Sequence, residues 1–382
     1  MAPFNMPESV YQAYKSDFQN GVVTLGNLCS AKCTFCSQYW NPSGVIQNLE
    51  RLLTWEEVKH FIDEYLVKVG ENPHVSPSIG SALHANSGEF FLHPNAARIL
   101  EYLKTNNKLE DNQMVISNGM NFRKEHIELL KGLKIGIQLS LFATDVSARM
   151  DVMKGSLSQN QRAIDTLDLF ESQGIEYGVT IVPYKKYLRN GVMEKIFSDL
   201  KGHHVKEFVM HKPGYTKLTP ANIVEELNIP DQELLDFGAM IWDKYQMNVR
   251  IEGVLPVEKN VSEFLRLSKS LEPLRNLGNK FKLFLCSPKA HSLIKLVLRK
   301  MEMQDYELKP VESHVFGGSV DCAGLLTVED YVIAINEYLT GGGKKVDFIV
   351  MSKRSFDINK EDLKMVSVYK LEEIFNAKVL LV

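Results

Sequence analysis

The chain has 382 residues, which is enough for two or three domain-sized units or for one large barrel with an extension. Hydrophobic residues make up 45% and charged residues 24%, as in ordinary globular proteins, and the formal net charge is −3. Basic residues form only pairs, such as Lys185-Lys186, which argues against a nucleic-acid substrate. Residues 1–20 lack the basic start and apolar run of a signal peptide, and no segment is as long as a membrane span, so we expect a cytoplasmic protein.

Short apolar runs alternate with amphipathic segments from residue 21 to residue 211. The amphipathic segments predict helices, the first of them capped by Thr54, over 54–69, 95–105, 124–133, 158–172 and 191–200. The apolar runs predict strands at 21–25, 79–83, 114–117, 135–141, 177–182 and 205–211. Because the connections are short, we expect an α/β fold with a parallel sheet, a partial (β/α)6 barrel over residues 1–247.

The spacing becomes irregular beyond residue 248. Short strands are predicted at 281–286, 346–350 and 379–382, and Gly341-Gly342-Gly343 is typical of a hinge. We expect residues 248–382 to form an α+β accessory domain that covers the substrate pocket.

Three of the five cysteines lie within eight residues, at Cys29, Cys33 and Cys36. Clustered thiols in a chain without a secretory leader usually serve metals or catalysis rather than disulfides. Structural zinc needs four ligands, so a distant residue such as His84 or His93 would have to complete the site. An iron–sulfur cubane takes one thiolate per iron, so three cysteines would leave one iron open to a substrate or cofactor.

The cysteine spacing, with Phe35 directly before the last cysteine, resembles the signature of the radical S-adenosylmethionine (radical SAM) enzymes. The resemblance implies that Cys29, Cys33 and Cys36 bind a [4Fe-4S] cluster and that Phe35 lies beside the cofactor. In that family the open iron chelates S-adenosylmethionine. An electron from the cluster then cleaves the cofactor to methionine and a 5′-deoxyadenosyl radical, which abstracts hydrogen from the substrate. The resemblance also implies oxygen sensitivity and an electron donor such as flavodoxin or ferredoxin.

The Ser87-Gly88-Glu89 segment stands where the family has a Gly-Gly-Glu segment that holds the ammonium group of the cofactor. Ser87 departs from that pattern, whereas Gly88 and Glu89 keep it. A carboxylate is a sensible partner for a cation. The alternative is a turn with a solvated Glu89.

Further candidates follow the predicted strands, at the edge where parallel α/β barrels carry functional residues. Asn118-Gly119 is a turn signal, and in the family a similar pair lies on the rim of the cofactor pocket. The Ser140 hydroxyl is expected to form a hydrogen bond with the ribose of the cofactor. The alternative partner is a backbone carbonyl. Arg149 is a candidate to bind the carboxylate of the cofactor, because the donors of a guanidinium suit a carboxylate. The alternative is that Arg149 is a solvated charge. Residues 182–184 and 211–213 are expected to line adenine or substrate.

Residues 316–327 resemble the domain of unknown function that follows the barrel in some radical SAM proteins, and this resemblance implies no known chemistry. Cys322, between glycines, is a candidate hydrogen-atom donor, with a buried structural cysteine as the alternative. Cys286 is expected to be buried and structural. Because a second cluster would need three or four ligands, we expect one cluster only.

The cysteine motif predicts the radical and not its target. Few basic residues gather in one place and no cysteine-rich tail is present, so we expect a small-molecule substrate, a metabolite in a biosynthetic or tailoring step, rather than RNA or a peptide. Two other hypotheses stay open. One is a zinc-binding structural or interaction protein, and the other is a non-catalytic iron–sulfur carrier.

Overall fold

The structure, a computed structural model, describes residues 4–19, 21–36, 39–40, 49, 51–66, 88–109, 113–254, 261–321, 323–357 and 359–382. The chain divides into two compact units. The described residues of the first unit run from 4 to 254, except for 215–218, which group with residues 261–382 in the second unit. Ser87, Cys322 and the predicted strand at 79–83 lie outside the described residues, so the predictions made for them stay predictions.

The first unit contains a parallel sheet of five strands among its described residues. The strands are β1 (Met114–Ser117), β2 (Gly136–Ser140), β3 (Tyr177–Ile181), β4 (Val205–His211) and β5 (Val249–Glu252). Each strand pairs with the one before it, so their order in space is their order in the chain. The predicted α/β class is confirmed, and this strand order is the one found in β/α barrels.

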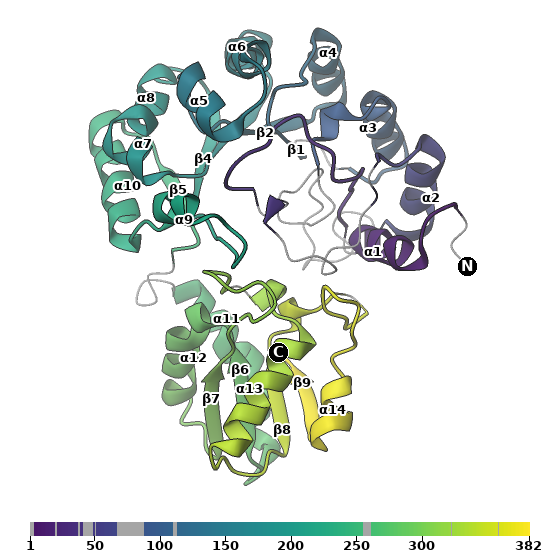
Figure 1. The fold of residues 1–382 in the computed structure, drawn as a ribbon, viewed down its shortest axis with the longest axis vertical. Helices are drawn as coiled ribbons and strands as arrows, with labels where there is room; N and C mark the ends of the chain where they lie inside the picture. The colour runs from purple at the N-terminus through teal and green to yellow at the C-terminus, as the bar shows by residue number, and fades with distance from the viewer. Residues whose placement is uncertain are drawn as a thin grey trace. The chain divides into compact units, whose positions relative to one another are not determined.

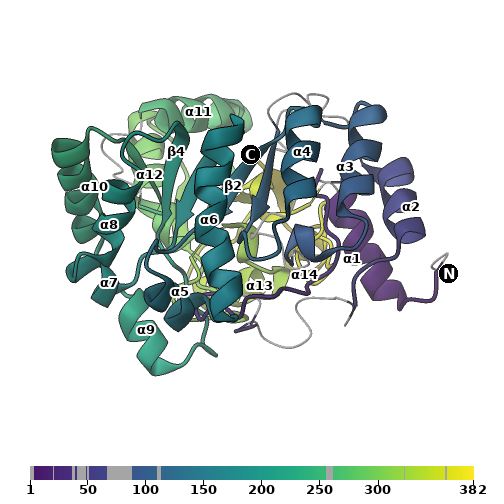
Figure 2. The same ribbon diagram turned by 90° about the horizontal axis from the view of Figure 1, so that it is seen from above.

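Ten α-helices accompany this sheet in the described part of the first unit, together with the short 3₁₀ helix η2 (Phe90–Leu92). The α-helices are α1 (Glu8–Gln19), α2 (Trp55–Tyr65), α3 (Ala96–Thr105), α4 (Lys124–Leu133), α5 (Val146–Met153), α6 (Leu157–Gln173), α7 (Lys185–Arg189), α8 (Val192–Asp199), α9 (Ala221–Leu227) and α10 (Asp231–Tyr245). Both views show α2, α3 and α4 side by side in chain order (Figures 1 and 2). Thr54 caps α2 as predicted, because its hydroxyl accepts from Glu57 N at 3.2 Å.

One prediction about this unit is wrong. Residues 21–25 form no continuous strand, although Val23 lies in an isolated β-bridge. The carbonyl oxygens of Leu25 and Gly26 accept hydrogen bonds from Leu53 N and Gly88 N at 3.0 and 2.7 Å. The first unit continues past the boundary expected at residues 247 and 248, because β5 pairs with β4 and residues 249–254 group with it.

The two faces of the first sheet differ in polarity, because side chains alternate along each strand. One face carries apolar residues that are buried, among them Val115, Ile137, Leu139, Val179 and Phe208. The other carries polar residues, and there Gln138 Nε2 donates to Thr180 Oγ1 at 2.7 Å. The apolar face packs into the core. The opposite face of the sheet carries side chains that can form hydrogen bonds.

Among its described residues, the second unit contains a four-stranded sheet in the order β7-β6-β8-β9, with every pairing parallel. Its strands are β6 (Lys282–Cys286), β7 (Tyr306–Pro310), β8 (Phe348–Met351) and β9 (Lys378–Leu381). Its helices are α11 (Val261–Leu271), η3 (Glu272–Leu277), α12 (Pro288–Lys300), η4 (Ala323–Leu325), α13 (Val328–Thr340), η5 (Lys353–Ser355) and α14 (Lys370–Phe375). Apolar clusters cover both faces of the sheet. The unit is therefore α/β, and the expected α+β arrangement is wrong.

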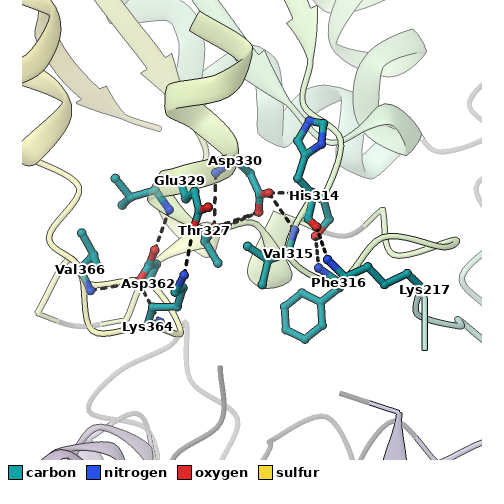
Figure 3. Close-up of polar contacts among 12 residues, drawn as sticks. Lys217, His314, Val315, Phe316, Thr327, Glu329, Asp330, Asp362, Lys364 and Val366 are labelled. Carbon is teal, nitrogen blue, oxygen red and sulfur yellow. Dashed lines mark hydrogen bonds and ion pairs between the residues drawn. The ribbon is translucent and has the colours of Figure 1, made fainter. Parts of the chain in front are cut away.

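Two buried carboxylates order the loops beside α13 (Figure 3). Asp330 accepts from the backbone N of His314 at 2.7 Å and of Thr327 at 2.9 Å. Asp362 accepts from Val328 N at 2.6 Å and from Val366 N at 3.0 Å. Because main-chain donors occupy these carboxylates, their role is to hold the loops, including residues 314 and 315.

Residues 215–218 are held in the second unit by a pair of glycines. Gly317 and Gly318 have φ angles of +64° and +66°, and a Cβ on Gly318 would lie 2.2 Å from Tyr215 O. Tyr215 N donates to Ser319 Oγ at 3.0 Å, and Tyr215 O accepts from Ser319 N at 2.9 Å. The left-handed backbone at these glycines, which other residues rarely adopt, makes room for the segment.

Among the described residues, no helix combines the length and the apolar character that crossing a membrane requires.

Candidate functional site

The three clustered cysteines lie on a loop that is fixed to the end of α5. Lys32 N donates to Met153 O at 3.1 Å, and Thr34 N donates to Val152 O at 2.9 Å. The last carbonyl groups of a helix have no partner within it, so the loop supplies the donors that α5 lacks. The helix, which the sequence analysis did not predict, therefore holds the cysteine loop in place.

None of the three cysteines forms a disulfide, and all three are half-buried. Burial, and then the nearby Glu89 carboxylate, raises the pKa of Cys29 to about 12. Burial raises the pKa of Cys33 well above its usual value, and Cys36 and Cys29 raise it further. The thiols are therefore close enough to influence one another, and each must lose its proton on binding a metal.

Aromatic side chains pack around the loop. The ring of Phe35 stacks on Phe142 with centroids 6.3 Å apart and meets Tyr184 edge-on at the same distance. The hydroxyl groups of Thr34 and Tyr184 are 2.5 Å apart. Phe35 therefore lies in an aromatic cluster beside the cysteines, and its predicted place beside a cofactor stays a prediction.

Gly88 and Glu89 lie directly against the residues that precede Cys29. Gly88 N donates to Gly26 O at 2.7 Å, and Glu89 N donates to Leu28 O at 2.9 Å. The predicted Gly88-Glu89 pair is thus brought to the cysteine loop by main-chain hydrogen bonds.

The carboxylate of Glu89 is buried, so the alternative of a solvated side chain is wrong. Its Oε1 accepts from Ser117 Oγ at 2.7 Å and from Phe91 N at 3.3 Å, and its Oε2 accepts from Asn118 N at 2.8 Å. Burial raises the pKa of Glu89, and these hydrogen bonds and Arg149 oppose the rise. A buried carboxylate at this edge of the sheet can receive a cation.

Asn118 connects the carboxylate to the thiols. It is buried at the end of β1, and its Nδ2 donates to Cys29 Sγ at 3.3 Å. Its backbone N binds Glu89, as described above. The sequence predicted a place for Asn118 near a cofactor pocket, but not this bond to sulfur, because nothing in an Asn-Gly turn signal indicates which side chain the amide faces.

Arg149, on α5, is completely buried, so its reading as a solvated charge is wrong. Its guanidinium donates to three main-chain oxygens at the ends of β1 and β2, those of Asn118, Ser140 and Leu141. Burial lowers the pKa of Arg149 to about 10, which leaves it protonated at neutral pH. Both terminal nitrogens thus tie two strand ends together, whereas the buried Nε has no hydrogen-bond partner among the described residues. The contact of Arg149 with a cofactor carboxylate stays a prediction.

Ser140 is the last residue of β2 and is half-buried, on the same face of the sheet as Gln138 and Thr180. Its position at the carboxyl edge agrees with the alternation assumed from the sequence. The bond from its hydroxyl to a ribose stays a prediction.

The zinc alternative loses one proposed ligand. His93 is buried, its Nε2 lies 2.7 Å from Leu53 O, and its Nδ1 accepts from Asn95 N at 3.0 Å. Both ring nitrogens are therefore occupied, and His84 lies outside the described residues. Within the part of the chain that the structure describes, no three His, Cys, Asp or Glu side chains surround a single point as the ligands of one ion do.

These residues fit an iron–sulfur cluster better than a single ion. A cluster takes one thiolate per iron atom, so its cysteines need to surround a group of atoms rather than one point. The three cysteines lie on one loop, their thiols influence one another, and one sulfur accepts an N–H donor, which suits such a cluster. A cluster held in this way would be bound by Cys29, Cys33 and Cys36. By contrast, Cys286 is buried at the end of β6, in the second unit, as expected.

Comparison with known proteins gives one family match. Residues 23–188 match the Radical SAM superfamily. The matched range contains the cysteine loop, Glu89, Asn118, Ser140 and Arg149.

The chain is also similar to individual proteins over parts of their length. One is the antilisterial bacteriocin subtilosin biosynthesis protein AlbA of Bacillus subtilis (strain 168), which is 35% identical over 103 residues, or 26% of this chain and 22% of AlbA. Among solved structures, Streptococcus suis SuiB bound to precursor peptide SuiA aligns with a TM-score of 0.46 and 17% identity, over 61% of this chain and 48% of SuiB. A radical SAM methyltransferase from Sphaerobacter thermophilus aligns with a TM-score of 0.44 and 15% identity, over 60% of this chain and 64% of that protein. These matches span less than two thirds of each relative.

Proposed function

We propose that the protein is an enzyme that cleaves S-adenosylmethionine reductively, from the premise that residues 23–188 match the Radical SAM superfamily. Cys29, Cys33 and Cys36 bind three irons of a [4Fe-4S] cluster. The observation that carries the proposal is the position of three cysteines on one loop beside the buried carboxylate of Glu89.

Bound together, the cluster and S-adenosylmethionine supply a 5′-deoxyadenosyl radical that abstracts hydrogen from a substrate. The chain's own residues prepare the place where this happens. Glu89 accepts the ammonium group of the cofactor, which offsets the cost of its burial. Asn118 and Arg149 fix the strand ends around that carboxylate, and the aromatic cluster at Phe35 excludes water from one side of the cysteine loop. An electron donor such as flavodoxin or ferredoxin, in the cytoplasm, completes the system.

The proposed substrate is a small metabolite in a biosynthetic or tailoring step, because the sequence has neither a basic surface for RNA nor further clustered cysteines. A precursor peptide is the second candidate. It is favoured by the 35% identity over 103 residues with AlbA, a protein of bacteriocin biosynthesis.

The proposal is tested by replacing each clustered cysteine with alanine in anaerobically reconstituted protein. Each of the Cys29→Ala, Cys33→Ala and Cys36→Ala variants should lose the cluster and the formation of 5′-deoxyadenosine while the barrel stays folded. Cys286→Ala is the control, since it removes a thiol that lies in the second unit, and it should keep both. Full turnover in any of the three loop variants contradicts the assignment.

The two substrate classes are separated by deuterium exchange. Candidate metabolites and precursor peptides are deuterated at carbon and incubated with the reduced enzyme. The true class should accelerate release of 5′-deoxyadenosine and transfer deuterium to it. If only peptides do so, the small-metabolite proposal is wrong.

A further inference from the structure

We propose that the side-chain amide of Asn118 is a redox-tuning residue, which donates a hydrogen bond to a cluster thiolate and raises the reduction potential of the cluster. This inference rests on the proposed function, because it assumes a cluster on Cys29, Cys33 and Cys36. It assigns to Asn118 a role at the metal rather than on the rim of the cofactor pocket.

The first step is the contact itself. Asn118 Nδ2 lies 3.3 Å from Cys29 Sγ and donates to it. Asn118 is only 7% exposed, so water does not compete freely for either group. In such surroundings a hydrogen bond to a charged acceptor is stronger than it is in water.

The second step is the orientation of the amide, since the oxygen and nitrogen of an asparagine are assigned from their partners. Asn118 Oδ1 accepts a hydrogen bond from Met120 N at 2.9 Å. A backbone N–H cannot face an NH₂ group, so the oxygen must stay on that side. The NH₂ group is therefore directed at the sulfur.

The third step is the rigidity of the residue. Asn118 N donates to Glu89 Oε2 at 2.8 Å, and Asn118 O accepts from the Arg149 guanidinium. With the two side-chain bonds, all four polar groups of Asn118 have partners. The amide thus keeps its direction when the charge on the sulfur changes.

The direction of the effect follows from charge. Reduction adds an electron to the cluster and makes its thiolates more negative. A donor that points at one of those sulfurs stabilises the reduced state more than the oxidised state, and hydrogen bonds to sulfur are among the factors that set cluster potentials.

The test is an EPR-monitored redox titration of reconstituted protein without S-adenosylmethionine. Asn118→Leu removes the donor at similar size, and Asn118→Asp keeps the acceptor for Met120 N but replaces the NH₂ group with a negatively charged oxygen. Both variants should have lower reduction potentials than the wild type, Asn118→Asp the lower of the two.

Asn121 provides a matched control. It lies on the same loop, and its Nδ2 donates to Ser30 Oγ at 2.6 Å, next to Cys29 but not to sulfur. Asn121→Leu should loosen the loop equally and leave the potential unchanged.

A second measurement detects the hydrogen bond in the wild type itself. Wild-type protein labelled with ¹⁵N-asparagine should show, by pulsed EPR of the reduced cluster, a ¹⁵N coupling that disappears in Asn118→Leu. If the coupling is absent, or if Asn118→Leu binds iron normally and keeps the wild-type potential, the inference is wrong. A wild type that assembles no cluster contradicts instead the proposed function.

Discussion

Gly88 and Leu28 touch so closely that position 88 has no room for a side chain. A Cβ on Gly88 would lie 2.0 Å from the carbonyl oxygen of Leu28, the residue before Cys29. No pair of carbon and oxygen atoms approaches so closely without one of them moving. The glycine therefore determines where the cysteine loop begins.

The Gly88→Ala variant should bind less iron than the wild type. The added methyl group must push Leu28 and with it Cys29 away from the site, and overpacking of this kind costs about 1–3 kcal/mol. Iron and sulfide content after anaerobic reconstitution measures the loss, and urea unfolding measures the cost.

Gly132 in α4 is the control for this substitution. A Cβ there would meet nothing within 4 Å, so Gly132→Ala should raise the unfolding free energy by about 1 kcal/mol through helix propensity and leave iron binding unchanged. If both variants bind iron like the wild type, Gly88 does not position the loop.

The Arg149→Met variant should be strongly destabilised. It leaves the carbonyl oxygens of Asn118, Ser140 and Leu141 without their donor, and each unpaired buried acceptor costs about 1–3 kcal/mol. Urea unfolding should show a loss of about 3 kcal/mol or more.

Arg162 is the control for this substitution. It tests whether the loss of any arginine that donates to a main-chain oxygen near β1 would lower the unfolding free energy as much. Its guanidinium also donates to a main-chain oxygen, that of Met120 at 3.2 Å, but its side chain is exposed. Arg162→Met should therefore cost at most about 0.5 kcal/mol. Equal losses in the two variants would show that burial of Arg149 does not matter.

The stability of the metal-free protein should fall as the pH rises through the pKa of Glu89. Because burial raises this pKa above its usual 4.5, the folded chain binds the proton more tightly than the unfolded chain does. The stabilisation is fully present below pH 4.5 and is lost as the carboxyl ionises, at about 1.4 kcal/mol for each unit by which the pKa is raised. Glu89→Gln, which cannot ionise, should lack this component, so parallel pH profiles would contradict it.

The Gly318→Ala variant should release residues 215–218. Its Cβ would collide with Tyr215 O, and the left-handed backbone at Gly318 would be strained by a side chain. Lys217, whose backbone N donates to Phe316 O at 2.8 Å, should then be cleaved faster by trypsin. Gly324→Ala, where the nearest atom would be 3.5 Å away, is the control and should be cleaved at the wild-type rate.

The sequence predicted best those elements whose ends carry a local signal. β1, β4 and α4 have the predicted bounds, and α6 ends at Gly174, whose φ of +65° suits a glycine cap. The sequence analysis missed α5 because this helix depends on contacts with distant parts of the chain. Its eight residues are too few for a clear period, and its last carbonyl groups find their partners in the cysteine loop, far away in the chain.

The sequence analysis missed β5 and β7 because both strands contain charged residues. β7 includes Glu307 and Lys309 and ends at Pro310, and β5 alternates Arg250 and Glu252 with apolar residues. Neither run is apolar enough to indicate a strand in a parallel sheet. Because β7 was missed, the sequence analysis could not predict the all-parallel sheet of the second unit. Because β5 was missed, it could not predict where the first unit ends.

At the site, the sequence predicted where the functional residues lie better than it predicted which groups they bind. Glu89 and Asn118 lie beside the cysteine loop as expected. The fork of Arg149, however, binds main-chain oxygens, because a guanidinium meets a strand end as readily as it meets a ligand, and the choice depends on how α5 packs.

The central claim, that this chain cleaves S-adenosylmethionine at a cluster on Cys29, Cys33 and Cys36, is tested most directly by one anaerobic assay. Purified protein is reconstituted with iron and sulfide, reduced with dithionite and mixed with S-adenosylmethionine, and 5′-deoxyadenosine is quantified. The account predicts about four irons per chain and release of 5′-deoxyadenosine together with methionine. A colourless zinc protein, or a cluster that leaves S-adenosylmethionine intact, would contradict it.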